Sequence, residues 1–447
     1  MPWLPRPWAG CWICLRSIQN RSGAGRAGEG RAHLHCAPAQ GGLMPILFGV
    51  VLLDLIGFGI VIPILPFLSP QLGASKIDIA LIIVSYAVCA GISGPFWGRL
   101  SDRRGRKPVI MICLAGAAVS YVMLALATEL WMIFAARAFA GIMAGNLGVA
   151  SAMMSDITTP EKRAKGMGLI GAAFGLGLVL GPLLGGLLAG DSGSFMLPCL
   201  VAGCMSMLAI LAAGLFLPES VTAQRRAAHR QAHRDGSRQS TLAMLRATGN
   251  RLLVLQYVLH AAAISSVTYL VPLWLGDVLG WGAREVGLVF GVQGAIMVVL
   301  QGGLLGALVR WLGEWRLLRL SVAAFMAGLC LAVVAAGMPL MLAAVYIAMS
   351  GSTLCMPLLN TITSHRTPAD LRGQMLGTTA SAASWGRVVG PLSAGANLSL
   401  FGYTGAWLGC IVVVSLYLAW ALGPHPASAA SEDSSLEENP PHDYPTV

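Results

Sequence analysis

Charged residues are scarce in this chain. Only 11% of its 447 residues are Asp, Glu, Lys or Arg, whereas 56% are hydrophobic and the mean hydropathy is +0.72. Helices at the surface of a soluble protein need a polar face, and the long apolar runs in this sequence have almost none. The composition therefore excludes a soluble globular protein and indicates a chain that crosses a membrane several times.

Several patterns that carry chemistry are also missing. The sequence has no G-x-x-x-x-G-K-[ST] loop, so we expect that ATP is not the energy source. It has no His/Glu or Ser/His grouping typical of a catalytic site, and we expect neither an enzyme nor a cofactor. The ten cysteines lie mostly inside apolar runs, where Cys behaves as a small hydrophobic residue. Cys11 and Cys14 could form one pair of zinc ligands. The residues available for a second pair, His33, His35 and Cys36, lack the usual spacing, so no metal is expected.

The basic residues follow a topological pattern. The formal net charge is +10, and most Lys and Arg residues fall in alternate loops, the first of which holds Arg103 to Lys107. By the positive-inside rule, this distribution predicts that both termini face the cytoplasm. We expect a multi-pass protein of the plasma (inner) membrane. Because the same rule accounts for the charge, we expect the lipid bilayer as a partner and no nucleic acid.

Twelve apolar segments follow Pro45, and each is long enough to cross a hydrocarbon core of about 30 Å as a helix. Barrel strands would be shorter and would alternate in polarity, so the runs favour helices. The sequence predicts an all-α membrane protein with twelve transmembrane helices. The segments are 45–69, 77–97, 108–127, 130–152, 166–189, 195–217, 252–275, 285–309, 316–337, 339–361, 373–397 and 401–422.

Three regions differ from these spans. Residues 1–43 are Arg-, Gly- and Pro-rich, and we expect a disordered extension or a misassigned start with Met44 as the first residue. The basic segment 218–250 is either a solvated linker or an amphipathic helix on anionic lipid. The tail 423–447 is acidic and Pro/Ser-rich, which is typical of disorder.

Landmarks recur at an offset of 208 to 209 residues. Thr159-Pro160 reappears as Thr367-Pro368, and Gly181-Pro182 reappears as Gly390-Pro391. The repeat predicts two six-helix halves, 44–217 and 251–422, as in carriers that work by alternating access.

Two charges lie inside the first-half spans, at similar expected depths. Asp54 is in span 1 and Arg137 is in span 4, so the two could pair. Burial disfavours the charged form of a carboxylate, whereas a nearby Arg favours that form. Asp54 could therefore change its protonation state and is a candidate proton site. The alternative is a structural ion pair. His260 in span 7 is a second titratable candidate, more simply a hydrogen-bonding group of a cavity, and Arg387 in span 11 has no obvious acid.

Glycines in span 5 and a charged turn after span 2 complete the candidate site. Gly177, Gly181 and Gly185 recur every four residues, which lets helices approach closely, either as a generic packing face or as a moving interface between the halves. Asp102 can pair with an Arg or accept hydrogen bonds from a helix N-terminus, although the basic residues beside it also serve as topology signals. In the second half Asp102 is replaced by Arg310.

These motifs resemble those of the major facilitator superfamily. Gly98-x-Leu100-x-Asp102-Arg103-x-Gly105-Arg106-Lys107 is similar to its loop 2–3 signature, and the span 5 glycines are similar to its antiporter motif. The motifs of spans 1 and 4 resemble twelve-span drug:proton antiporters, in particular tetracycline-resistance efflux proteins. The resemblance implies a cytoplasmic gate and a seal against leak. The gate would comprise Gly98, Asp102, Arg103, Gly105, Arg106 and Lys107; the antiporter motif would comprise Gly171, Gly175, Gly177, Gly181, Pro182, Gly185 and Gly186.

The sequence departs from the tetracycline pumps at two positions. Their acidic residues in spans 3 and 9 correspond to Ser120 and Phe325, which puts tetracycline itself in doubt as a substrate. We expect a monomeric, proton-coupled exporter of small amphipathic compounds, with protons and a small-molecule substrate as partners. The alternatives are a metabolite carrier with the same fold or a non-transporting membrane receptor.

Overall fold

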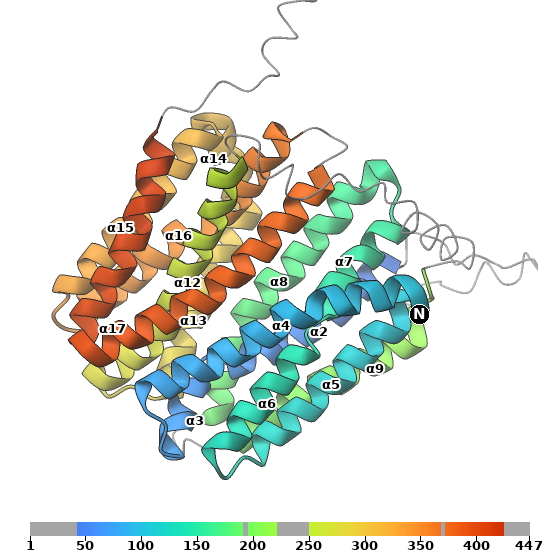
Figure 1. Cartoon of the computed structure of the whole chain (residues 1–447), viewed down its shortest axis with the longest axis horizontal. Coiled ribbons are helices and arrows are strands. Elements are labelled where there is room, and N and C mark those ends of the chain that lie inside the picture. Colours follow the sequence, from blue (N-terminus) through green and yellow to red (C-terminus); the bar gives the residue numbers. More distant parts are fainter. Residues whose placement is uncertain (1–42, 191–194, 221–249, 368–371, 424–447) are drawn as a thin grey trace, which may run out of the picture. The chain divides into compact units, whose positions relative to one another are not determined.

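The computed structural model describes residues 43–190, 195–220, 250–367 and 372–423, and these residues form helices and no strand (Figure 1). The Cys/His group near the N-terminus, the tail after residue 423 and most of the basic linker lie outside these ranges. The first group of helices is α2 (Leu43–Val61), α3 (Leu65–Gln71), α4 (Lys76–Arg104), α5 (Arg106–Ala125), α6 (Leu130–Ile142), α7 (Asn146–Ile157), α8 (Pro160–Ala189) and α9 (Met196–Phe216). The second is α12 (Asn250–Leu279), α13 (Ala283–Met297), the π-helix η2 (Val298–Leu304), α14 (Leu305–Leu312), α15 (Glu314–Val334), α16 (Met338–Arg366) and α17 (Arg372–Leu422).

Eleven of the described helical segments are long and apolar enough to cross a membrane. The last of them, in α17, holds two of the expected spans. Gly402 lies inside α17 with φ 66° and ψ −166°, which is not a helical conformation, so two consecutive helices meet there. The predicted helical membrane fold is confirmed, and the merging of two helices at Gly402 explains why twelve expected segments correspond to eleven in the structure.

Two predicted spans are interrupted. Span 1 breaks between α2 and α3 at Pro63, whose ring cannot continue a regular helix. Span 4 breaks at residues 143–145, and two side chains of α4 bind the carbonyls at the break. Ser93 donates to the carbonyl of Gly141 at 3.0 Å, and the Trp97 indole donates to that of Ile142 at 2.5 Å. These bonds satisfy backbone groups that lipid would leave unpaired.

The charged stretch 98–108 is more helical than the predicted turn. α4 continues through Arg104 and α5 begins at Arg106, so only Gly105 forms the turn, with φ 115° and ψ 157°. Gly313, 208 residues later, joins α14 to α15 with φ 76° and ψ 158°. A side chain is strained at such positive φ values, which explains glycine at both positions. The repeat seen in the sequence is therefore a repeat of backbone conformation.

Each helix group packs mainly within itself. α2 packs against α8 and α9, α5 against α9 and α4 against α6, whereas α12 packs against α17 and α15 against α16. The two main pairs that join the groups are α8 with α13 and α4 with α17 (Figure 1).

Candidate functional site

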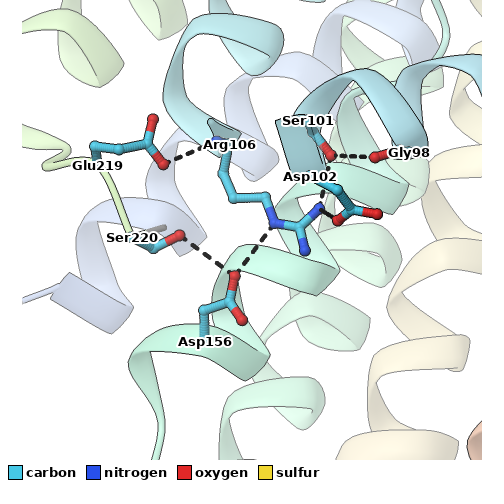
Figure 2. A network of polar contacts seen from close by, with 7 residues as sticks. All are labelled: Gly98, Ser101, Asp102, Arg106, Asp156, Glu219 and Ser220. Atoms are coloured by element: carbon cyan, nitrogen blue, oxygen red, sulfur yellow. Dashed lines mark hydrogen bonds and ion pairs between the residues drawn. The ribbon is translucent and has the colours of Figure 1, made fainter. Parts of the chain in front are cut away.

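Arg106 is the centre of a polar cluster at the turn between α4 and α5 (Figure 2). Its guanidinium forms ion pairs with Asp102 at 2.7 Å and with Asp156 of α7 at 3.2 Å. The guanidinium also donates to Ser101 Oγ at 2.6 Å, and the backbone N–H of Arg106 donates to Glu219 at 2.9 Å. The Arg106 side chain is only 9% exposed, so both ion pairs have one buried member. This Arg106 cluster ties the ends of α4, α5 and α7 to the segment after α9.

The other predicted residues of the turn make fewer polar contacts than Arg106. Lys107 donates to the carbonyl of Gly214 at 2.8 Å, near the end of α9, and Gly98 accepts from Ser101 at 2.8 Å. Arg103 is exposed. Gly105 leaves no room for a side chain, because a Cβ there would overlap the Glu219 carboxylate.

Two acids of the cluster, Asp156 and Glu219, were not predicted from the sequence. Each is a single acid at the end of a span, next to loops whose basic residues set the topology. A search for acids at span ends on the side of Arg106 would have found both.

Replacing Arg106 with glutamine is expected to lower the free energy of unfolding by about 2 kcal/mol, because Asp102 and Asp156 lose their common cation. Arg103→Gln is the matched control, because Arg103 is exposed and lies on the same turn. Thermal unfolding of both purified variants in detergent measures the difference. Equal midpoint shifts in the two variants would contradict the assigned importance of the Arg106 cluster.

Asp54 and Arg137 are both buried, at 7% and 5% exposure, but the expected ion pair between them does not form. The Asp54 carboxylate accepts a short hydrogen bond from the amide of Asn146, the first residue of α7 after the break in span 4. The Arg137 guanidinium lies over the Tyr86 ring, 4.5 Å from its centroid. Similar depth in the membrane places two residues at one level, but helix rotation decides which groups meet. Asp54 thus has Asn146 as its partner in place of Arg137, and Arg137 has Tyr86 as its partner in place of Asp54.

The two candidates of the second half are His260 and Arg387. His260 is buried at 4% exposure, and its ring meets Tyr417 edge-on with centroids 5.9 Å apart. Its Nδ1 has no hydrogen-bond partner among the described residues. Arg387 is exposed on α17 and donates to Ser384 Oγ at 2.9 Å, which supplies the partner that the sequence did not indicate.

Two positions where the tetracycline pumps have acids serve packing in this chain. Ser120 is 3% exposed, and its hydroxyl donates to the carbonyl of Ala117 in its own helix at 2.7 Å. Phe325 is fully buried in the second-half core. Neither position carries a charge, and the described residues around them form a packed interior.

The α8 glycines face two different helices. A Cβ on Gly177 would lie 2.5 Å from Leu55 Cβ, and one on Gly181 would lie 2.5 Å from Gly59 Cα, so these glycines pack against α2 in the same half. Gly186 instead faces α13, where its Cβ would lie 2.8 Å from Gly287 Cα. The stripe of every fourth glycine thus faces the same half, and the neighbouring Gly186 approaches the other half. Gly171 has open space around it, and Gly175 is in ordinary contact distance of Met297.

A polar contact that joins the two helix groups lies at the end of α4 opposite Arg106. Lys76, the first residue of α4, forms an ion pair with Asp277 of α12 at 2.5 Å. Asp277 also accepts from the Tyr403 hydroxyl at 2.7 Å, and the Tyr269 hydroxyl donates to the Lys76 carbonyl at 2.6 Å. These four residues, the Lys76 cluster, hold the start of α4 against α12 and α17.

Comparisons with known proteins agree with this architecture. Residues 47–391 match the family model described as Major Facilitator Superfamily. The tetracycline resistance protein, class C, of Escherichia coli is 30% identical over 387 residues, which cover 83% of this chain and 94% of that protein. Major facilitator superfamily domain-containing protein 10 of Mus musculus is 28% identical over 454 residues, covering 87% and 94%. The crystal structure of the human organic anion transporter MFSD10 (TETRAN) superposes with a TM-score of 0.66 and 23% identity, over 86% of this chain and all of that one (100%). The chain therefore belongs to the Major Facilitator Superfamily, and within it resembles the tetracycline-resistance efflux proteins.

Proposed function

We propose that the chain is a proton-coupled secondary transporter that exports small amphipathic compounds by alternating access. In this proposal it is a monomer of the inner membrane with both termini in the cytoplasm, and its moving units are 44–217 and 251–422. Asp54 binds the transported proton and Arg137 modulates that binding. The Arg106 cluster forms the cytoplasmic gate, and α8 seals the contact between the halves.

The observation that carries the proposal is the environment of Asp54. This carboxylate is buried in an apolar span, and the one hydrogen bond found for it among the described residues comes from Asn146. Charged groups inside a membrane are costly and generally mark ion or substrate pathways. The bond partner lies at a break in span 4, and interrupted helices commonly form the ion sites of secondary transporters.

The distribution of contacts supports alternating access. The Lys76 cluster joins the two helix groups at one end of α4, and the Arg106 cluster, at the other end, ties together α4, α5 and α7 of the first group. Gly186 and Gly287 also meet near the end of α8 and the start of α13. A transporter held closed at one end by such contacts must break them to open there, and can then close at the other end.

The substrate is a separate question from the transport mechanism. The relatives named for tetracycline resistance favour drug export, whereas Ser120 and Phe325 lack the charges of those pumps. The second candidate is therefore a metabolite carrier on the same frame.

Reconstitution into proteoliposomes tests the proposal. An imposed pH difference across the membrane should drive net movement of compounds that the protein recognises, and dissipating that difference with an ionophore should stop it. A susceptibility panel in a host that lacks its own pumps supplies the compounds, tetracycline among them. Transport that is indifferent to the pH difference would disprove proton coupling, and protection against no drug in the panel would favour the metabolite carrier.

A further inference from the structure

Arg137 is a buried cation without a matching anion. Its side chain is 5% exposed, its Nε has no hydrogen-bond partner, and it forms no ion pair with any carboxylate among the described residues. Asp54, the buried acid of the same half, is bonded to Asn146 instead. Buried charges in proteins are usually paired, and in membranes they usually face a pathway or each other. Among the described residues Arg137 thus has no carboxylate partner, and a negatively charged ligand would provide the missing anion.

A second guanidinium lies at a similar level in the other helix group. Arg137 lies over the ring of Tyr86, on α4, at 4.5 Å. α17 packs against α4, with Gly395 beside Ala80 and Tyr403 beside Lys76, so the two helices run in opposite directions. Arg387 comes two turns before Gly395, which puts it near the level of Tyr86. Arg387 is exposed and donates to Ser384 of its own helix, so its guanidinium has further donors available for an anion.

The surroundings of Tyr86 also suit an apolar group. The Phe58 ring of α2 lies 5.3 Å from the Tyr86 ring, and both side chains are half-buried rather than enclosed. Partly exposed aromatic rings beside guanidinium groups offer a planar apolar surface together with bidentate hydrogen-bond donors. Asp54 lies one helical turn before Phe58 on α2, so the proposed site has two cations and one acid. One negative charge on a ligand would balance this set, whereas a cation would add to the excess.

We propose that Arg137 and Arg387, from the two helix groups, bind the acidic group of an amphipathic organic anion whose planar apolar part lies on Tyr86 and Phe58. The ligand class is thus a compound with a fused or aromatic ring system and a carboxylate or sulfonate. This inference rests on the proposed transport function, for which it names the substrate class. Because one guanidinium comes from each half, a bound anion would also link the halves.

A pair of xanthene dyes of opposite charge tests the charge preference on a shared ring system. Fluorescein is an anion and rhodamine 6G is a cation, and their binding to the full-length purified protein can be followed by fluorescence anisotropy. Fluorescein should bind more tightly. Arg387→Gln should weaken fluorescein binding by about tenfold, the loss expected for one charge-assisted hydrogen bond, and should leave rhodamine 6G unaffected or tighter. Arg387 is exposed, so this variant is expected to fold, and Arg310→Gln is the control for loss of an exposed arginine on the second half.

Three results would overturn the anion site: preference for rhodamine 6G, binding of neither dye, or equal weakening of both dyes by Arg387→Gln. Equilibrium binding needs no proton gradient. A protein that binds the two dyes equally could therefore still transport its substrate with protons. Conversely, a protein without proton coupling should still prefer fluorescein if Arg137 and Arg387 form the anion site.

Discussion

Proteoliposomes that contain Asp54→Asn are expected to lose accumulation of substrate against its gradient. Each proton exchanged per substrate allows a pH difference of one unit to sustain a concentration ratio of about ten, and an amide cannot carry that proton. Asparagine has nearly the same shape as aspartate, and its carbonyl can still accept the bond from Asn146. The fold should therefore survive while the concentration ratio falls from about ten toward one.

The measurement needs two readouts to separate coupling from binding. Accumulation under an imposed pH difference reports coupling, whereas exchange of labelled for unlabelled substrate without a gradient reports binding and conformational change. Asp54→Asn should lose the first and keep the second. Asp78→Asn is the matched control, because Asp78 is an acid on α4 that caps its own helix through Ser75. Full accumulation by Asp54→Asn would move the proton site to another residue.

Gly181→Ala is expected to destabilise the protein by about 3 kcal/mol, the upper part of the range for overpacked cores. The added Cβ would lie 2.5 Å from Gly59 Cα and 2.9 Å from the Ile56 carbonyl, both of which are backbone atoms of α2. A side chain can rotate away from such a contact, but a helix backbone must move as a whole. Gly59 faces the same restriction from the other side, because its own Cβ would lie 2.7 Å from the Gly177 carbonyl.

Gly171→Ala is the control on the same helix, since nothing lies within 4 Å of a Cβ there. Alanine favours a helix over glycine by about 1 kcal/mol, so this variant should be neutral or more stable. Unfolding in mild detergent, followed by circular dichroism, compares the two variants. Similar midpoints would mean that α2 and α8 are not held at the close approach described above.

The sequence was sufficient to predict the helices, because segments that cross lipid must be apolar and must satisfy their own backbone hydrogen bonds. It was also sufficient to predict the repeat, because the positive φ at Gly105 and Gly313 requires glycine in both halves. It was insufficient for contacts across helices. Asp54 and Arg137 lie at similar depth, yet their rotation about the helix axes gives them different partners. Asn146 carried no periodic signal within an apolar run, although its place directly after Gly145 marks the break in span 4.

α7 gives the site a property that no single residue has. Its first residue, Asn146, bonds Asp54, and in its last turn Asp156 pairs with Arg106. A helix of 12 residues is about 18 Å long and transmits displacement along its axis with little internal deformation. The break at residues 143–145 separates it from α6. Because α7 links the two sites, we expect the effects of Asp54→Asn and Arg106→Gln to be non-additive, which a double-mutant cycle measures.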